Sequence, residues 1–286
     1  MSQAFWGMPV ELHWVDQGPD LQTAFHDGWI RILGAKGISM GGFTTHHFEE
    51  GPSFAYLNMY RLLAENELLA QPRDEEPSSF TNDETSATMT WDHLGGAGRL
   101  AIRYQIIPDS LAIDAHISVE PARSYRNFEV FVANYFTPYH TPRYAVTDTQ
   151  VTPDPITFYE KQWDGSAENS AWPRDEQARA IFRDGRWTQG HTINWRLGPD
   201  YALPVMTQYH RYGPAVITMG REPDCVGISG LFSYHNSQYV HLFGTDVDAG
   251  DHLATDLRMV LVPDVSADEL TDRAVEEYRQ WTAGDQ

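Results

Sequence analysis

The alternation of apolar and polar residues in LAIDAHISVE, residues 111–120, constrains the fold more than any other feature of the sequence. Every odd-numbered position in it is apolar, whereas the even-numbered positions include Asp114, His116, Ser118 and Glu120. A period of two residues is typical of an antiparallel strand with one buried face and one solvated face. A chain built from such strands has to cover their apolar faces with a second layer.

The same alternation recurs between turn signals through most of the chain. Glycine-rich and proline-containing turns separate the segments, and we expect further strands over residues 86–93, 99–107, 128–136, 214–220, 226–234, 238–244 and 253–262. Short strands at this regular spacing predict an all-β fold, a large antiparallel β-sandwich. Because β-sandwiches of this length are often one unit, we expect a single domain over residues 1–286.

Two segments interrupt the series of strands. Residues 160–200 are rich in Trp, Asp, Gly and Pro and predict a long irregular excursion, with one short helix over 173–182 that starts at Pro173. Residues 266–281 predict a C-terminal helix, because Ser266 and Glu269 have the spacing of a capping box. Residues 55–70 fit either a helix or strands.

Charge and cysteine content exclude several function classes. The net charge is −20, from 40 acidic and 20 basic residues, so the chain repels nucleic acid and anionic membranes. No run approaches the roughly 20 apolar residues of a membrane-spanning helix, and the N-terminus lacks the pattern of a signal peptide. The single cysteine, Cys225, rules out an internal disulfide and suits a reducing compartment. We therefore expect a cytoplasmic protein with a small-molecule partner.

The order of these segments from residue 86 onward resembles the galactose mutarotase-like family. The resemblance rests on the hairpins over 86–120, on FEVFVANYFTPYH at 128–140, and on FGTDVDAGDHLATDLRMVLV at 243–262. It implies a β-supersandwich fold and a carbohydrate ligand in a cleft on the concave sheet. The family's epimerases use a histidine acid and a carboxylate base. The chain lacks their Asn-His-x-x-Phe-Asn segment, since Asn134 and His140 are spaced differently, so only the fold is carried over.

The first candidate site follows the strand at 128–136. Asn134 interrupts an apolar row on that strand, and Tyr139, His140 and Arg143 follow around two prolines. Aromatic rings can pack on the C–H face of a sugar, its hydroxyls need polar partners, and an arginine can bind a sugar acid through two parallel hydrogen bonds. The segment is either the rim of a binding site or a well-packed loop.

A second segment with the same chemistry lies at residues 207–212. It contains Tyr209, His210 and Arg211, and the two segments could converge on one cleft, although the sequence alone does not show that they meet. Alternation along a strand places Tyr209 and Arg211 on one face and His210 on the other. The alternative is that these side chains only form hydrogen bonds across a sheet.

Two further positions complete the predicted ligand site. His47 belongs to GGFTTHHFEEG at 41–51, and Trp163 lies in the excursion, where it would offer a stacking surface. The adjacent His46 and His47 point to opposite faces of a strand, so no metal site is predicted. No P-loop, dinucleotide fingerprint or nucleophile elbow occurs in the sequence, and we expect no cofactor.

These observations leave three hypotheses about function. In the first, an enzyme uses His140 or His210 as proton donor and Glu222 or Asp246 as base. In the second, the protein is a non-catalytic carbohydrate-binding module. In the third, it is an interaction protein without a sugar ligand, a possible homo-oligomer whose excursion packs against another subunit.

Overall fold

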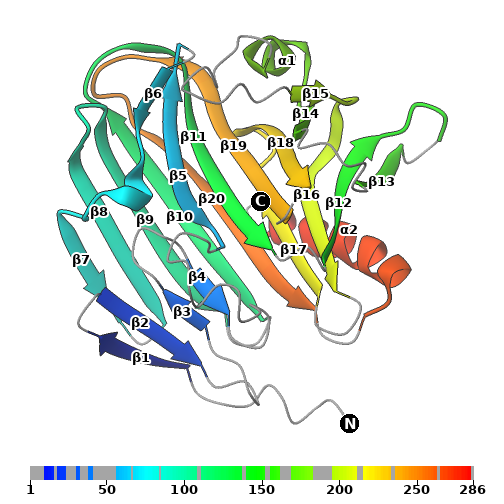
Figure 1. The fold of residues 1–286 in the computed structure, drawn as a ribbon, viewed down its shortest axis with the longest axis horizontal. Coiled ribbons are helices and arrows are strands. Elements are labelled where there is room, and N and C mark those ends of the chain that lie inside the picture. Colours follow the sequence, from blue (N-terminus) through cyan, green and yellow to red (C-terminus); the bar gives the residue numbers. More distant parts are fainter. Residues whose placement is uncertain are drawn as a thin grey trace.

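Two large β-sheets face each other and form the body of the molecule (Figure 1). The structure is a computed structural model. It describes residues 10–15, 18–23, 30–32, 38–40, 56–65, 67–83, 85–107, 111–136, 140–151, 155–161, 169–182, 195–210, 215–232, 236–262 and 265–284. The sandwich architecture predicted from the alternating segments is confirmed.

The larger sheet has nine antiparallel strands. In spatial order they are β13 (Ile156–Glu160), β12 (His140–Thr147), β16 (Tyr201–His210), β17 (Ala215–Gly220), β20 (Leu253–Val262), β10 (Ala112–Pro121), β9 (Gly98–Ile107), β8 (Ser86–Leu94) and β7 (Ser79–Asn82).

The smaller sheet has seven strands. In spatial order they are β15 (Trp195–Leu197), β14 (Asn169–Pro173), β18 (Cys225–Phe232), β19 (Asn236–Val247), β11 (Tyr125–Phe136), β5 (Asn58–Ala64) and β6 (Glu67–Ala70). A short 3-10 helix, η3 (Pro72–Asp74), follows β6. Two hairpins lie apart from both sheets, β1 (Val10–Val15) with β2 (Gly18–Thr23) and β3 (Ile30–Ile32) with β4 (Ile38–Met40).

Apolar side chains from both sheets interlock in the space between them. Val130 and Val132 of β11 and Val240 of β19 meet Leu100 and Ile102 of β9 in one continuous core. Neighbouring positions on a strand point to opposite faces, so the residues between these valines lie on the side of the smaller sheet that faces away from the larger one. We call that side the outer face of the seven-stranded sheet.

The alternation seen in residues 111–120 has the predicted consequence. In β10, Ala115, Ile117 and Val119 are buried, whereas His116 between them is exposed. The glycine-rich turn before β9 also has the expected geometry, since Gly95 and Gly96 take positive φ angles of 53° and 78°. Such angles are readily adopted only by residues without a Cβ atom.

The two segments that interrupt the pattern are more regular than the sequence indicates. Within 55–70, the described residues 56–65 and 67–70 contain β5 and β6 and no α-helix. The excursion over 160–200 contains β14 and β15, both of which join the seven-stranded sheet. Its helix, α1 (Glu176–Phe182), begins later than predicted, because Pro173 ends β14 and the Asp175 side chain accepts a hydrogen bond from the Ala178 N–H at 2.8 Å. Trp172 packs the excursion against the core, because its ring stacks on that of Tyr144 with the centroids 4.0 Å apart.

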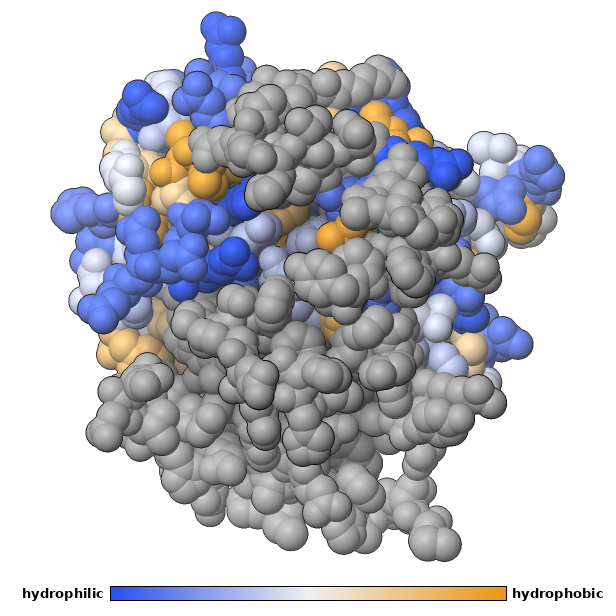
Figure 2. All heavy atoms as spheres, viewed as in Figure 1, coloured by the Kyte–Doolittle hydropathy of each residue, from blue (hydrophilic) through white to orange (hydrophobic). Residues whose placement is uncertain are grey.

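The C-terminal helix, α2 (Ala267–Ala283), is confirmed together with its capping box at Ser266 and Glu269. Its buried face packs on the side of the nine-stranded sheet that points away from the core, where Leu270, Ala274 and Tyr278 meet residues of β16 and β17. Figure 1 shows this helix behind the lower parts of β12 and β16. On the described part of the face shown in Figure 2, hydrophilic surface is more extensive than apolar surface.

Within the described residues, neither α-helix is long and apolar enough to cross a membrane.

The single cysteine provides a test of the core. Cys225 is fully buried, and its burial raises the pKa of the thiol to about 12. Because the thiolate is the reactive form, we expect the native protein at pH 8 to react with a thiol reagent such as DTNB only as fast as it unfolds. The same protein in guanidinium chloride should react at once. Rapid stoichiometric labelling of the native protein would contradict the described packing.

The contact between α1 and the sheet provides a second test. A Cβ atom added at Gly227 of β18 would lie 2.6 Å from the ring of Phe182, the last residue of α1. Gly227→Ala should therefore displace the helix and lower the free energy of unfolding by about 1–3 kcal/mol in urea denaturation. Gly220→Ala is the control, because its added Cβ has no neighbour nearer than 3.4 Å. Equal stability of the two variants would contradict this contact.

Candidate functional site

Aromatic side chains gather on the outer face of the seven-stranded sheet. Phe131 and Tyr135 of β11, Tyr239 of β19 and Tyr60 of β5 form one group, in which Phe131 stacks on Tyr239 with ring centroids 4.9 Å apart. Tyr60 lies 5.5 Å from Phe131 and 6.3 Å from Tyr135. The group is separate from the core between the sheets.

A β-bulge brings two consecutive side chains of β5 to this group. Arg61 pairs with Phe131 and Met59 pairs with Val132, so Tyr60 is an extra residue between the two pairs. A bulge of this kind redirects side chains that regular alternation would place on opposite faces. Accordingly, the guanidinium carbon of Arg61 lies 4.4 Å from the centroid of the Tyr60 ring.

A second arginine reaches the same ring from η3. The guanidinium carbon of Arg73 lies 4.0 Å from the Tyr60 centroid, and its Nη1 donates a hydrogen bond to the Tyr135 hydroxyl at 3.3 Å. Cations over the face of an aromatic ring are stabilised by the ring quadrupole. The face thus combines aromatic rings, of which Phe131, Tyr135 and Tyr239 are buried, with two positive charges.

Next to the aromatic group lie three polar side chains that contact one another. The Nε2 atom of His241 (β19) is 2.7 Å from the Oγ atom of Ser229 (β18), and its Nδ1 atom is 3.6 Å from a carboxylate oxygen of Glu129 (β11). Glu129 is 2% exposed, and the other two are fully buried. An imidazole beside a carboxylate is suited to moving protons, because histidine exchanges its proton near neutral pH.

Two phenylalanine rings fix the orientation of His241. Phe131 and Phe182 each meet the imidazole edge to face, at 4.4 Å and 4.6 Å between centroids. Phe182 comes from α1, so the excursion contributes directly to this arrangement.

Tyr135 and Tyr239 of this group are neutral at physiological pH. Burial raises the pKa of Tyr239 well above its usual value. Burial, followed by the neighbouring Tyr239 and Tyr60 hydroxyls, raises the pKa of Tyr135 in the same way, against the smaller opposing effect of Arg73. Their hydroxyl groups can therefore both donate and accept hydrogen bonds.

Several residues predicted from the sequence lie elsewhere. Asn134 is buried between the sheets, where its Oδ1 accepts a hydrogen bond from the Leu57 N–H at 2.7 Å. Asp246, exposed near the end of β19, accepts one from the Asn127 N–H at 3.0 Å. Glu222 follows β17 and lines a separate depression with His116. The structure does not bring these three side chains together.

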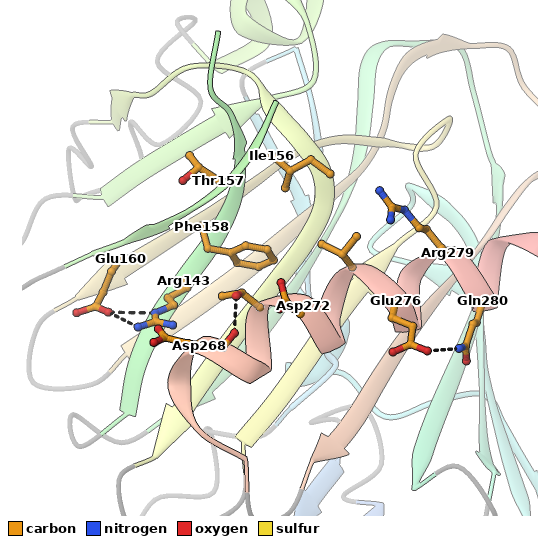
Figure 3. Close-up of a pocket in the computed structure, with 12 residues that line it drawn as sticks. Arg143, Ile156, Thr157, Phe158, Glu160, Asp268, Asp272, Glu276, Arg279 and Gln280 are labelled. Carbon is orange, nitrogen blue, oxygen red and sulfur yellow. Dashed lines mark hydrogen bonds and ion pairs between the residues drawn. The ribbon is translucent and has the colours of Figure 1, made fainter. Parts of the chain in front are cut away.

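Arg143 and Tyr209 lie on the opposite side of the molecule, near α2. Arg143 binds the Glu160 carboxylate through Nε and Nη2 at 3.0 and 2.9 Å, and its Nη1 donates to the carbonyl of Ala267. It forms part of the lining of a groove of about 710 Å³ between β12, β13 and α2 (Figure 3). Arg143 thereby holds the start of the helix, and Tyr209 packs in the apolar layer beneath it.

The two segments that the sequence suggests for one cleft are neighbours in the sheet. β12 pairs with β16, and the register places His140 opposite His210. Both backbones are described, whereas their side chains lie outside the described part of the structure. Tyr139, Arg211, His47 and Trp163 also lie outside the described residues.

Sequence reasoning missed the residues that the outer face assembles. Glu129 interrupts one face of β11 as Asn134 interrupts the other, and this was a signal available in the sequence. Tyr60 and Arg61 depend on a bulge that alternation does not reveal. In the described part of the chain, no three His, Cys, Asp or Glu side chains are grouped so that they could hold a metal ion.

No family model matches the chain, and no curated protein matches it. Solved structures do match. α-N-Acetylgalactosaminidase NagBb from Bifidobacterium bifidum, in complex with GalNAc, has 12% identity and a TM-score of 0.53, over 92% of this chain and 39% of that one. The ligand-free form of the same protein has 14% identity and a TM-score of 0.50, over 90% and 38%. This chain thus spans well under half the length of that enzyme.

Matches of lower similarity include a putative aldose 1-epimerase from Escherichia coli K12, with 9% identity and a TM-score of 0.48 over 89% of this chain and 99% of that one. At identities of 14% or less, the likeness to the Bifidobacterium bifidum enzyme is one of fold alone. The chain has a β-sandwich fold that also occurs in an enzyme named for its action on a carbohydrate.

Proposed function

We propose that this protein binds a carbohydrate on the outer face of the seven-stranded sheet. The observation that carries the proposal is that this one face collects four aromatic rings, two guanidinium groups and the His241–Glu129 pair. Ligand sites generally combine an aromatic lining with a few polar groups that fix orientation. A sugar has both an apolar C–H face and hydroxyl groups, so it suits such a surface.

The same face supports acid–base chemistry on the bound sugar. In the proposed reaction His241 gives a proton to the ring oxygen, and Glu129 takes the proton of the anomeric hydroxyl. The bond between the anomeric carbon and the ring oxygen breaks as the carbonyl forms. Closure on the other face of the carbonyl returns both protons, so the sum is an interconversion of anomers. The fold shared with a carbohydrate enzyme is consistent with this role, although fold alone does not specify function.

The site predicted from the sequence is the alternative location. His140 and His210 pair across β12 and β16 and stay candidates for the proton donor. Their predicted carboxylate partners are less well supported, because Asp246 accepts a backbone hydrogen bond near the exposed end of β19 and Glu222 lies in a separate depression.

A binding module without catalysis is the second candidate function. Ser229, His241 and Glu129 are almost completely buried and contact one another, which is also how a polar group supporting the sheet would be arranged. On this account the tyrosines and arginines would bind the sugar, and His241 would only hold the face in shape.

Variants of the two candidate histidines separate these possibilities. We expect an aldose panel to raise the melting temperature, since a ligand at 100 times its Kd adds about 2.7 kcal/mol. His241→Gln should slow anomer interconversion by about 100-fold or more, because positioned acid–base groups contribute at least that much. His210→Gln is the matched control and should retain the wild-type rate. Polarimetry or NMR exchange measures the interconversion.

Other outcomes are equally informative. A loss of turnover in His210→Gln with full turnover in His241→Gln would move the site to the β12–β16 end. Binding without interconversion in the wild type would establish the binding module. A panel without any shift in melting temperature would contradict the carbohydrate proposal itself.

A further inference from the structure

We propose that the carbohydrate bound on the outer face carries an anionic group, a carboxylate or a phosphate or sulfate ester, which Arg73 and Arg61 bind beside Tyr60. This inference rests on the proposed function and specifies its substrate class. The three acids share the oxygen geometry that a guanidinium recognises, and a panel of sugars distinguishes among them.

Arg73 is held in place for such a contact. Its guanidinium lies over Tyr60, and Nη1 is fixed by the Tyr135 hydroxyl, so the planar group has a set orientation. The side chain is 17% exposed, and its buried Nε has no hydrogen-bond acceptor in the described part of the chain. Buried donors normally have acceptors, and a bound anion would supply one here.

The nearest carboxylate does not fulfil this role. Asp74 lies 3.7 Å from the Nε of Arg73, which is beyond hydrogen-bond distance, and its own side chain is 55% exposed. An ion pair with so exposed a partner contributes little. A ligand carboxylate that is hydrogen-bonded to the guanidinium can therefore compete with it.

Arg61 provides the second positive charge. Both guanidinium carbons lie within 4.4 Å of the same ring centroid, so they are no farther apart than twice that distance. Two positive charges this close to one ring repel each other, and an anion that contacts both offsets the repulsion. The bulge that brings Arg61 next to Tyr60 is what creates the arrangement.

Because the whole protein is strongly acidic, an anionic sugar needs a local cluster of positive charge in order to bind. With a net charge of −20 the molecule repels anions at a distance, and Glu129 adds a carboxylate on the same face. A sugar acid can bind only where fixed positive charges outweigh the repulsion from these negative charges. Arg73, whose Nε has no acceptor within the described residues, provides such a place next to Tyr60, whereas Arg143 beside α2 already binds Glu160.

Calorimetric titration with glucose, glucuronate, glucose 6-phosphate and glucose 6-sulfate tests the inference. We expect at least one anionic sugar to bind tenfold or more tightly than glucose. Arg73→Met should reduce that preference to twofold or less, and Arg73→Lys should keep part of it, because the charge remains and the planar fork is lost. Circular dichroism and the melting temperature would reveal a folding defect in Arg73→Met. In that case Arg73→Lys provides the test instead.

Arg99→Met is the matched control. Arg99 pairs with exposed Asp92 and Glu120 at the β8–β9 hairpin, so its replacement removes the same charge at a remote place. It should leave the preference unchanged. An anionic preference that survives in Arg73→Met, or that Arg99→Met reduces equally, would overturn the assignment. Glucose binding as tightly as every anionic sugar would overturn the inference and leave the proposed function standing. If no sugar of either kind binds, both fail.

Discussion

The antiparallel pairing of β11 with β19 is the interaction on which the rest of the structure depends. Val130 and Val132 point from it into the core, and Phe131 and Tyr239 point from it to the outer face. One backbone ladder therefore fixes both the packing of the sandwich and the geometry of the candidate site. In the observed register Phe131 lies opposite His241. A slip of one residue in this pairing would move core side chains to the outer face and outer-face side chains to the core.

Three local departures from regular structure add side chains to the outer face beside this ladder. The bulge at Tyr60 turns two neighbouring side chains of β5 to the same face, η3 supplies Arg73, and α1 supplies Phe182. Each departure adds a group that an ideal sheet would not offer. The excursion thus has a defined part in the site, because its helix holds the imidazole of His241 from one side.

The sequence predicted the architecture well because alternation is a local property. The strand faces of β10, the glycine turn before β9 and the capping box at Ser266 all follow from neighbouring residues. The candidate site depends on pairings between distant segments. Asn134 and Arg143 have the chemistry of ligand contacts, but both have structural partners. Asn134 is buried and accepts a hydrogen bond from the Leu57 N–H, and Arg143 binds Glu160. Glu129 and His241 meet only through the β11–β19 register, which one sequence does not specify.

Aromatic NMR during a titration with sugars tests the central claim most directly. With ring-labelled tyrosine, our account predicts that a binding sugar shifts the resonances of Tyr60, Tyr135 and Tyr239, which lie on the outer face. Tyr209 under α2 should stay unchanged. Saturable shifts at Tyr209, with none at the three outer-face tyrosines, would contradict the account and place the ligand beside the helix.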